Sequence, residues 1–577
     1  MASYLSRLSP IPGFPEYTGP YKVGTIDVEI PISELDSPAK APSNAGNIPT
    51  IQYRIFYPCE AESKHKGKSV HWIPAPQRDY ISAYSRFLGA GSTLAEVISY
   101  FPRLLHYVTI PVRKDAPLLQ PITSNHRWPV MIFSHGLGGS RNAYSHIVGS
   151  VASHGMIVIA PEHRDGSTPI SYIREPFSDA SAIGKERHFK KHAKSTIEYV
   201  KLSHTPSPEV EDGRNAQLKI RLWEMGLIHE SLLKLDEGKK LTNLNTSSTS
   251  LSVFKNQMHI HEPGKITFAG HSFGAATVVQ FVKSVFYAPE SSSASKSYKP
   301  VYEPSPKSSI CSQITPNNPI ILLDCWCFPL RSQATRWLWD RPLPSYASSG
   351  PGGSAILAVE SQAFYKWTEH FNATKRLLSA DPSSHHPSSN GTSEPHFYYP
   401  TSSAHLSQSD FGVLFPWVTK KVFAAEEPER IMRLNVRAMM QLLRKRGVEV
   451  SQTCKEDLEL EGDGDEVETN DDKKIFGKDG GIRGWNWLSI SGSEAGAGTG
   501  VGARVDEGEE SEIADKKLDG KQVEVGTGGE GEEEGEGGRG RVGGDGKIGK
   551  PMGVVPTEVV MENEIGVGVG ASAGSKL

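Results

Sequence analysis

Residues 265–277, KITFAGHSFGAAT, constrain the fold of this chain more than any other stretch. An apolar run at 266–269 is followed at once by the G-x-S-x-G motif at 270–274 and then by two alanines, which are good helix formers. This order predicts a strand, a sharp turn and a helix, with the Ser272 hydroxyl presented at the end of a sheet. Ser272 is therefore the candidate nucleophile. The alternative is a turn of small residues in which the serine is incidental.

The composition divides the 577 residues into two parts. Up to about residue 450 the chain has the apolar runs, aromatic residues and prolines of a globular protein, whereas the remainder is rich in Gly, Glu, Asp and Lys and predicts a disordered tail. We expect an N-terminal extension (1–18), an enzyme domain (19–450) with insertions near 290–318 and 379–403, and an acidic tail (451–577).

Charge is distributed unevenly between these parts. The 29 acidic and 14 basic residues after Cys454 give the tail a net charge of −15, so a total of −4 leaves +11 for the rest. A basic body suits an anionic substrate or a phospholipid surface, although a solvated surface balanced by the tail explains it equally well.

Cysteine usage and the chain ends bear on the cellular compartment. Five cysteines at irregular spacing do not form a disulfide framework, and Cys325 and Cys327, a C-x-C without a second pair, are expected to be buried thiols. The sequence begins without an apolar signal-peptide region and contains no membrane-spanning run, so we expect an intracellular protein. It finishes with Ser575-Lys576-Leu577, which the peroxisomal import receptor reads, so a peroxisomal location is expected.

The remaining pattern predicts an α/β fold with a mostly parallel central sheet. Segments 24–32 and 51–57 alternate in polarity and predict antiparallel strands. Buried parallel strands are predicted at the apolar runs 129–133, 156–160, 319–323 and 355–359, and helices at 140–154, 184–203, 214–238 and 427–446. The aromatic-rich segment 81–110 is expected either to pack as helices over the core or to form an apolar lid or lipid-facing surface.

Two further residue types complete a candidate catalytic set. Asp324 follows the run 319–323, and His405 follows the second insertion. Nucleophile, acid and base then occur in the order Ser272, Asp324, His405, which is the chain order of α/β-hydrolases. Glu360, after the next apolar run, is an alternative acid. Residue spacing alone leaves the base open among His405, His370, His385, His386 and His396.

A glycine-rich loop, SHGLGG at 134–139, directly follows a predicted strand. Such a loop lets backbone N–H groups approach a ligand, so it is a candidate oxyanion-hole loop. It lacks the spacing and the Lys-Ser/Thr end of nucleotide-binding loops. His135 and His163 precede the serine and are expected to shape this region.

Several joined motifs carry a family resemblance that covers about residues 19–446. They are FSHGLGGSRNAYS (133–145), HGMIVIAPEHRDGS (154–167), GHSFGAAT (270–277), LLDCWCFPL (322–330) and AHLSQSDF (404–411), with weaker matches at Trp72-Ile73-Pro74 and Gly19-Pro20-Tyr21. In this order they resemble the platelet-activating factor acetylhydrolases of the plasma and intracellular type II group, within the α/β-hydrolase superfamily.

The resemblance implies a calcium-independent serine esterase of the 1-alkyl-2-acetylglycerophosphocholine esterase type, which removes a short or oxidised sn-2 acyl group from a phospholipid. It implies Ser272 as nucleophile, Asp324 as acid, His405 as base, and the backbone N–H groups of Leu137 and Phe273 as oxyanion donors. No cofactor, metal or nucleic acid is expected. We do expect a lipid substrate and contact with a lipid surface.

Three features depart from the family pattern. Cys325 and Cys327 vary the segment after the acid, two long insertions separate the triad residues, and the acidic tail has no counterpart. These departures concern the substrate range more than catalysis. Two alternative functions are also considered. One is a general carboxylesterase or lipase that acts on other esters, and the other is a non-catalytic binding protein that retains the hydrolase fold.

Overall fold

The computed structural model describes residues 13–46, 48–60, 69–88, 105–174, 194–245, 249–294, 298–384, 386–462 and 467–491. Several predictions lie outside these residues: the tail from residue 492 with its final tripeptide, His385, and residues 89–104 of the aromatic-rich segment 81–110. All five cysteines are free thiols, and Cys325 and Cys327 are buried.

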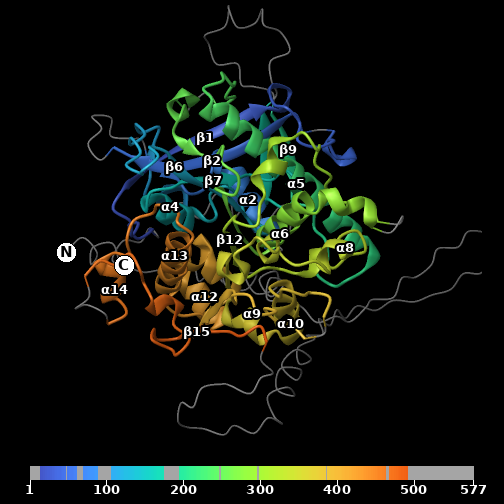
Figure 1. The fold of residues 1–577 in the computed structure, drawn as a ribbon. Helices are drawn as coiled ribbons and strands as arrows, with labels where there is room; N and C mark the ends of the chain where they lie inside the picture. Colours follow the sequence, from blue (N-terminus) through green and yellow to red (C-terminus); the bar gives the residue numbers. More distant parts are fainter. Residues whose placement is uncertain are drawn as a thin grey trace, which may run out of the picture. The chain divides into compact units, whose positions relative to one another are not determined.

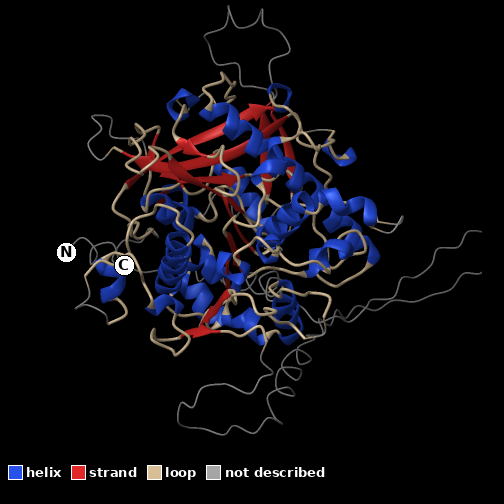
Figure 2. Ribbon diagram, in the orientation of Figure 1, coloured by secondary structure: helices blue, strands red, loops and turns tan. Residues whose placement is uncertain are grey.

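A central sheet runs through the described part of the chain (Figure 2). Its strand order is β15-β14-β13-β12-β11-β6-β7-β2-β1-β5, and β10 pairs with β6. The bounds are β1 (Lys22–Pro31), β2 (Thr50–Cys59), β5 (Arg113–Lys114), β6 (Trp128–Ser134), β7 (Ile157–Pro161), β10 (Met258–His259), β11 (Thr267–His271), β12 (Ile320–Leu323), β13 (Ile356–Val359), β14 (His396–Pro400) and β15 (Trp485–Trp487). Strands from β14 to β7 pair in parallel, whereas β2, β1 and β15 join antiparallel. Two smaller pairs are β3 (Val70–His71) with β4 (Thr109–Ile110) and β8 (Ile170–Arg174) with β9 (Lys194–Glu198).

Helices cover both faces of this sheet (Figure 1). They are α2 (Gln77–Phe87), α4 (Ser145–Ser153), α5 (Pro208–Asp236), α6 (Phe273–Phe286), α7 (Ser309–Gln313), α8 (Arg336–Trp339), α9 (Gln362–Lys366), α10 (Thr368–Leu377), α11 (Asp410–Leu414), α12 (Pro416–Phe423), α13 (Pro428–Lys445) and α14 (Lys455–Glu459). In β6, Val130 and Ile132 pack toward α5 and α6, and Met131 and Phe133 pack toward α4 and α13. Because both faces are covered, the parallel strands are continuous apolar runs.

This architecture confirms the predicted fold class, an α/β-hydrolase-type layering around a mostly parallel sheet. The four apolar runs are β6, β7, β12 and β13, and the alternating segments are the antiparallel pair β1 and β2. The predicted helix at 214–238 is α5, which begins six residues earlier because Ser207 caps it: its Oγ accepts the Val210 N–H at 3.3 Å.

Two secondary-structure predictions were wrong. Residues 194–198 of the predicted helix 184–203 form β9, which pairs with β8; strand pairing outweighed the local helical pattern there. The predicted insertion 379–403 contains β14, whose sequence HFYYP is flanked by Ser-, Pro- and Asn-rich residues that masked it. His405 therefore follows β14. Two strands, β13 and β14, lie between Asp324 and His405, whereas the sequence pattern predicted only one.

The predicted domain boundary at residue 450 also requires correction. Residues 467–491 contribute β15 to the central sheet, where Trp485 is 2% exposed, stacks on Tyr398 and donates its Nε1–H to the Ile475 carbonyl at 2.9 Å. Asp472 binds Arg437 of α13. The low apolar content of the long segment after 450, taken as an average, hid these few buried residues.

The predicted N-terminal extension likewise contacts the predicted enzyme domain. Tyr17 donates its hydroxyl to the Ser145 carbonyl at 3.1 Å, and the Gly19 N–H donates to Ser153 Oγ at 2.9 Å. Residues 13–18 thus lie against α4 rather than apart from the domain.

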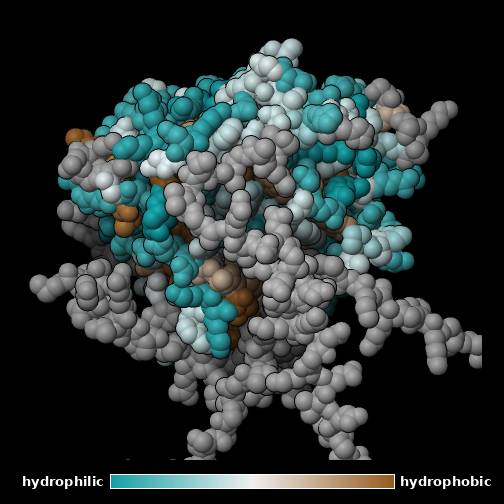
Figure 3. All heavy atoms as spheres, turned by 90° about the horizontal axis from the view of Figure 1, so that it is seen from below, coloured by the Kyte–Doolittle hydropathy of each residue, from teal (hydrophilic) through white to brown (hydrophobic). Residues whose placement is uncertain are grey.

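The described surface is largely hydrophilic on the side drawn in Figure 3, with apolar residues in small patches. Among the residues that the structure describes, no helix is both long enough and apolar enough to cross a bilayer.

Candidate active site

Ser272 occupies a strained turn between β11 and α6. Its backbone angles are φ 56° and ψ −121°, in a region that non-glycine residues rarely adopt. A Cβ added at Gly270 would lie 2.5 Å from the Gly274 carbonyl carbon, and one at Gly274 would lie 2.0 Å from the Ser134 oxygen. Only glycine therefore fits on either side of the serine. The Ser272 N–H donates to the Leu323 carbonyl at 2.9 Å, which fixes the turn to the end of β12.

Asp324 and His405 lie side by side in the interior. Asp324 directly follows β12, and its Oδ2 is 2.9 Å from His405 Nδ1; the two side chains are 0% and 4% exposed. The second carboxylate oxygen accepts the Ser361 N–H at 2.5 Å. Two hydrogen bonds hold the carboxylate in place, and the carboxylate in turn holds the proton of His405 on Nδ1, so that Nε2 is the basic nitrogen of the neutral ring.

Two rings flank His405. The Phe364 ring lies parallel to it, with 3° between the planes and 4.5 Å between centroids, and the His271 ring lies 4.3 Å away. Because His271 immediately precedes Ser272, this contact places His405 beside the serine turn.

The alternative acid, Glu360, is paired with a different histidine, His370. Glu360 is 1% exposed, and its carboxylate lies 3.9 Å from His370 Nδ1; burial raises the pKa of Glu360 well above its usual range. His370, one of the histidines that residue spacing left open as the base, is buried, and its Nε2 accepts the Cys327 N–H at 3.3 Å. The structure thus pairs Asp324 with His405 and sets Glu360 against His370.

The glycine-rich loop lies against the serine turn. A Cβ added at Gly136 would be 3.0 Å from the Ser272 Cβ. The backbone N–H groups of Leu137 and Phe273 donate to no acceptor within the described ranges, and Phe273 is the first residue of α6. A helix N-terminus leaves its first N–H groups unpaired and carries positive potential, which suits a negatively charged oxygen.

His135 and His163 lie behind this loop, as expected. His135 Nδ1 is 2.8 Å from the Gly136 carbonyl, and its Nε2 accepts the His163 N–H at 3.1 Å. Burial lowers the pKa of His135 to about 3, so the ring is neutral near pH 7. These contacts support the shape of the loop.

His271, Asp324 and His405 offer three ligand atoms within 4.8 Å of one another, the one such metal-compatible group among the described residues. Within this group, Asp324 and His405 are already joined by a hydrogen bond.

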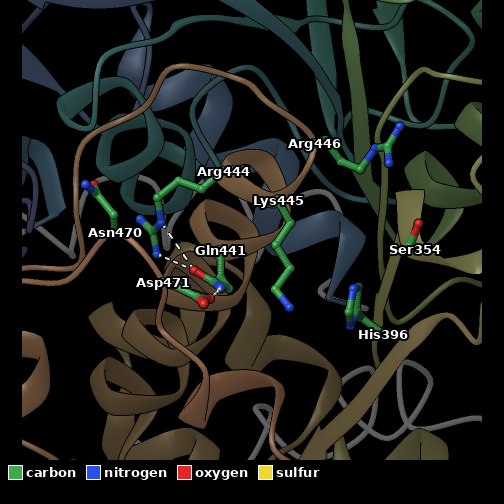
Figure 4. Close-up of a pocket in the computed structure, with 8 residues that line it drawn as sticks. All are labelled: Ser354, His396, Gln441, Arg444, Lys445, Arg446, Asn470 and Asp471. Atoms are coloured by element: carbon green, nitrogen blue, oxygen red, sulfur yellow. Dashed lines mark hydrogen bonds between the residues drawn. The ribbon is translucent and has the colours of Figure 1, made fainter.

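A cavity of about 410 Å³ lies near the end of α13, and Figure 4 shows its lining, which includes Arg444, Lys445 and Arg446. Ser354 and His396 of the lining stand at or just before the amino ends of β13 and β14. Ser272 and Asp324 follow the carboxyl ends of their strands, so this cavity belongs to the opposite edge of the sheet.

Sequence reasoning missed Phe364 and Tyr144 as neighbours of the site. No sequence signal indicated Phe364, whose position depends on the packing of α9. Tyr144 lies within one of the quoted motifs, at 133–145, and its hydroxyl is 2.7 Å from His271 Nδ1.

Comparison with known proteins finds one matching family and several similar proteins. The sequence model of the family "Platelet-activating factor acetylhydrolase, isoform II" matches residues 8–467. The platelet-activating factor acetylhydrolase of Canis lupus familiaris is 31% identical over 227 residues, which are 39% of this chain and 45% of the dog protein. A putative phospholipase A2 of Schizosaccharomyces pombe is 26% identical over 460 residues, covering 75% of this chain and 92% of the yeast protein.

A solved structure, the ferulic acid esterase from Streptomyces cinnamoneus, is 14% identical, with a TM-score of 0.38, and covers 75% of this chain and 92% of its own. The chain spans about half the length of the curated acetylhydrolases that it matches. Since the family model covers well over half of the sequence, this chain belongs to the platelet-activating factor acetylhydrolase isoform II family.

Proposed function

We propose that this chain is a serine esterase that hydrolyses the short or oxidised sn-2 acyl ester of phospholipids through an acyl-enzyme on Ser272. The observation that carries the proposal is the buried 2.9 Å hydrogen bond between Asp324 and His405, next to a serine held in a strained turn. Family membership supports the substrate class, because the curated relatives with this sequence pattern are named for acetylhydrolase activity.

In the first half of the reaction, His405 Nε2 takes the proton of Ser272 as the serine oxygen attacks the sn-2 carbonyl carbon. Asp324 stabilises the imidazolium that forms. The negatively charged carbonyl oxygen accepts hydrogen bonds from the N–H groups of Leu137 and Phe273. When the ester C–O bond breaks, His405 returns the proton to the departing lysophospholipid hydroxyl.

In the second half, His405 takes a proton from a water molecule, which attacks the acyl group on Ser272. The acid leaves and the serine recovers its proton. Since this scheme assigns proton transfer to His405 and charge stabilisation to backbone N–H groups, we propose that activity does not require calcium.

We also propose that α12 contacts the lipid surface from which the substrate comes. Trp417 is 70% exposed, and Lys421 Nζ lies 5.0 Å from the centre of its ring. An exposed tryptophan with adjacent lysines suits the interface between lipid headgroups and acyl chains. The helix follows α11, which packs against the turn that carries His405.

The experiment is acetate release from platelet-activating factor by the purified protein with calcium chelated, beside a soluble short-chain aryl ester and the Ser272→Ala variant. Hydrolysis of both esters by the wild type alone supports the proposal. Cleavage of the aryl ester alone would move the function to a general esterase. Wild-type activity that disappears on chelation and returns with calcium would contradict the calcium-independent scheme.

A further inference from the structure

We propose that Tyr144 is a positioning residue whose hydroxyl joins the glycine-rich loop to the serine turn and so sets the spacing of the two oxyanion donors. This inference rests on the proposed function, because it assigns a role within the same reaction. Tyr144 lies immediately before α4 and is 5% exposed.

Tyr144 touches both halves of the oxyanion hole through one oxygen atom. Its hydroxyl oxygen accepts the Gly136 N–H at 3.2 Å and is 2.7 Å from His271 Nδ1. Gly136 precedes the donor Leu137, and His271 lies two residues before the donor Phe273. A single hydroxyl therefore connects segments that are 135 positions apart in the sequence and that each carry one donor.

The space around this hydroxyl leaves little freedom. A Cβ added at Gly136 would lie 3.0 Å from the Tyr144 oxygen and 3.0 Å from the Ser272 Cβ. The aromatic ring packs against Phe133, with 5.2 Å between centroids. Since Leu137 follows Gly136 directly, a shift of the Gly136 amide would move the Leu137 N–H relative to the serine.

The same hydroxyl holds the His271 ring, which lies beside the candidate base. A hydroxyl has one donor hydrogen and two acceptor lone pairs, so this oxygen can accept the Gly136 N–H and still pair with Nδ1 in either tautomer of the ring. The His271 ring lies 4.3 Å from the His405 ring, which becomes positively charged during the reaction.

The segment that carries Tyr144 is itself tied to the His405 turn. The Asp410 carboxylate accepts the Ser145 N–H at 2.8 Å, the Ser145 hydroxyl at 2.5 Å and the His146 N–H at 2.9 Å. The Asp410 N–H donates to the Ala143 carbonyl at 2.9 Å. Tyr144 thus stands where the oxyanion loop, the serine turn and the histidine turn meet.

The test compares Tyr144→Phe with the wild type for ester hydrolysis and for binding of a trifluoromethyl ketone, which forms a tetrahedral adduct with an active-site serine. We expect kcat to fall about tenfold or more, less than the roughly 10²–10³-fold loss of an entire oxyanion donor, with KM unchanged. Affinity for the ketone should fall by the same factor as kcat/KM, because both depend on oxyanion stabilisation.

Tyr53→Phe is the matched control. Tyr53 is a fully buried tyrosine of β2 whose hydroxyl is 2.9 Å from Ser231 Oγ, so the variant loses a buried hydroxyl without touching the oxyanion region. Its kcat and ketone affinity should match the wild type.

A folded Tyr144→Phe with wild-type kcat and ketone affinity would overturn the inference, as would an equal loss of kcat in Tyr53→Phe. A wild-type protein that hydrolyses neither ester would instead contradict the proposed function, and the role of Tyr144 with it.

Discussion

Asp324 and His405 are 81 residues apart in the sequence, yet a 2.9 Å hydrogen bond joins the carboxylate Oδ2 to the imidazole Nδ1 in the interior. The pair lies where two distant segments meet, at the ends of β12 and of the connection after β14. This hydrogen bond holds the His405 proton on Nδ1, so Nε2 is the nitrogen that can accept the serine proton.

Asp324→Asn should lower kcat by about 10⁴-fold, because an amide NH₂ turned toward Nδ1 favours the wrong tautomer of His405. Steady-state kinetics on either ester measures this. Glu360→Gln is the matched control: burial raises the pKa of Glu360 well above its usual range and so favours the neutral carboxyl, which glutamine mimics, and kcat should be retained. A large loss in Glu360→Gln with little effect of Asp324→Asn would show that the acid has been assigned to the wrong residue.

Phe364→Leu should lower kcat several-fold while leaving KM nearly unchanged. The substitution removes the parallel ring that supports one face of His405, so the imidazole is held less firmly in its productive orientation. The same change at Phe397, a buried ring of β14, is the control and should reduce stability without this selective loss of kcat. Equal kcat effects in both variants would contradict a role for Phe364 beside His405.

The segment after residue 450 should be required for stability. Trp485→Ala is expected to cost about 3–5 kcal/mol of unfolding free energy, since it empties a buried site against Tyr398. Urea unfolding measures the loss. A chain ended after residue 450 should unfold at a lower temperature than the full chain, whereas one ended after Ser491 should not. If the shorter chain matched the longer one, the contribution of β15 to the fold would be refuted.

Lys283 should make stability depend on pH above neutrality. It is fully buried, donates to the Arg341 carbonyl at 2.6 Å, and burial lowers its pKa from 10.5 to about 7. Between about pH 7 and 10.5 the unfolded chain binds the extra proton, so this group makes the unfolding free energy rise with pH, by a few kcal/mol.

Urea unfolding across that window checks the linkage. Lys283→Met should remove the part of the rise that Lys283 supplies, whereas Lys455→Met, at a side chain 56% exposed, should keep the wild-type slope. Identical slopes in wild type and Lys283→Met would show that this lysine does not titrate in the window.

Much of the fold was predictable because the parallel strands are buried on both faces and so appear as uninterrupted apolar runs, as in β6 and β12. The five residues of β14 lack that signal in their polar surroundings, and β9 takes its structure from pairing with β8. In both elements tertiary contacts outweigh local sequence preference.

The residues of the candidate site also differ in how well the sequence predicts them. The Ser272 turn carries its own local pattern, since glycine is required on both sides. Residue spacing left His405 among five histidines, and only the family resemblance favoured it. The contact between Tyr144 and His271 joins residues 127 positions apart and has no local signature.

Fluorophosphonates react with activated serines, so mass spectrometry after such treatment tests whether His405 and Asp324 activate Ser272. We expect stoichiometric labelling of Ser272 in parallel with loss of esterase activity, and no labelling of heat-unfolded protein or of His405→Ala. Labelling of a different serine in step with inactivation, or full esterase activity in Ser272→Ala, would contradict this expectation.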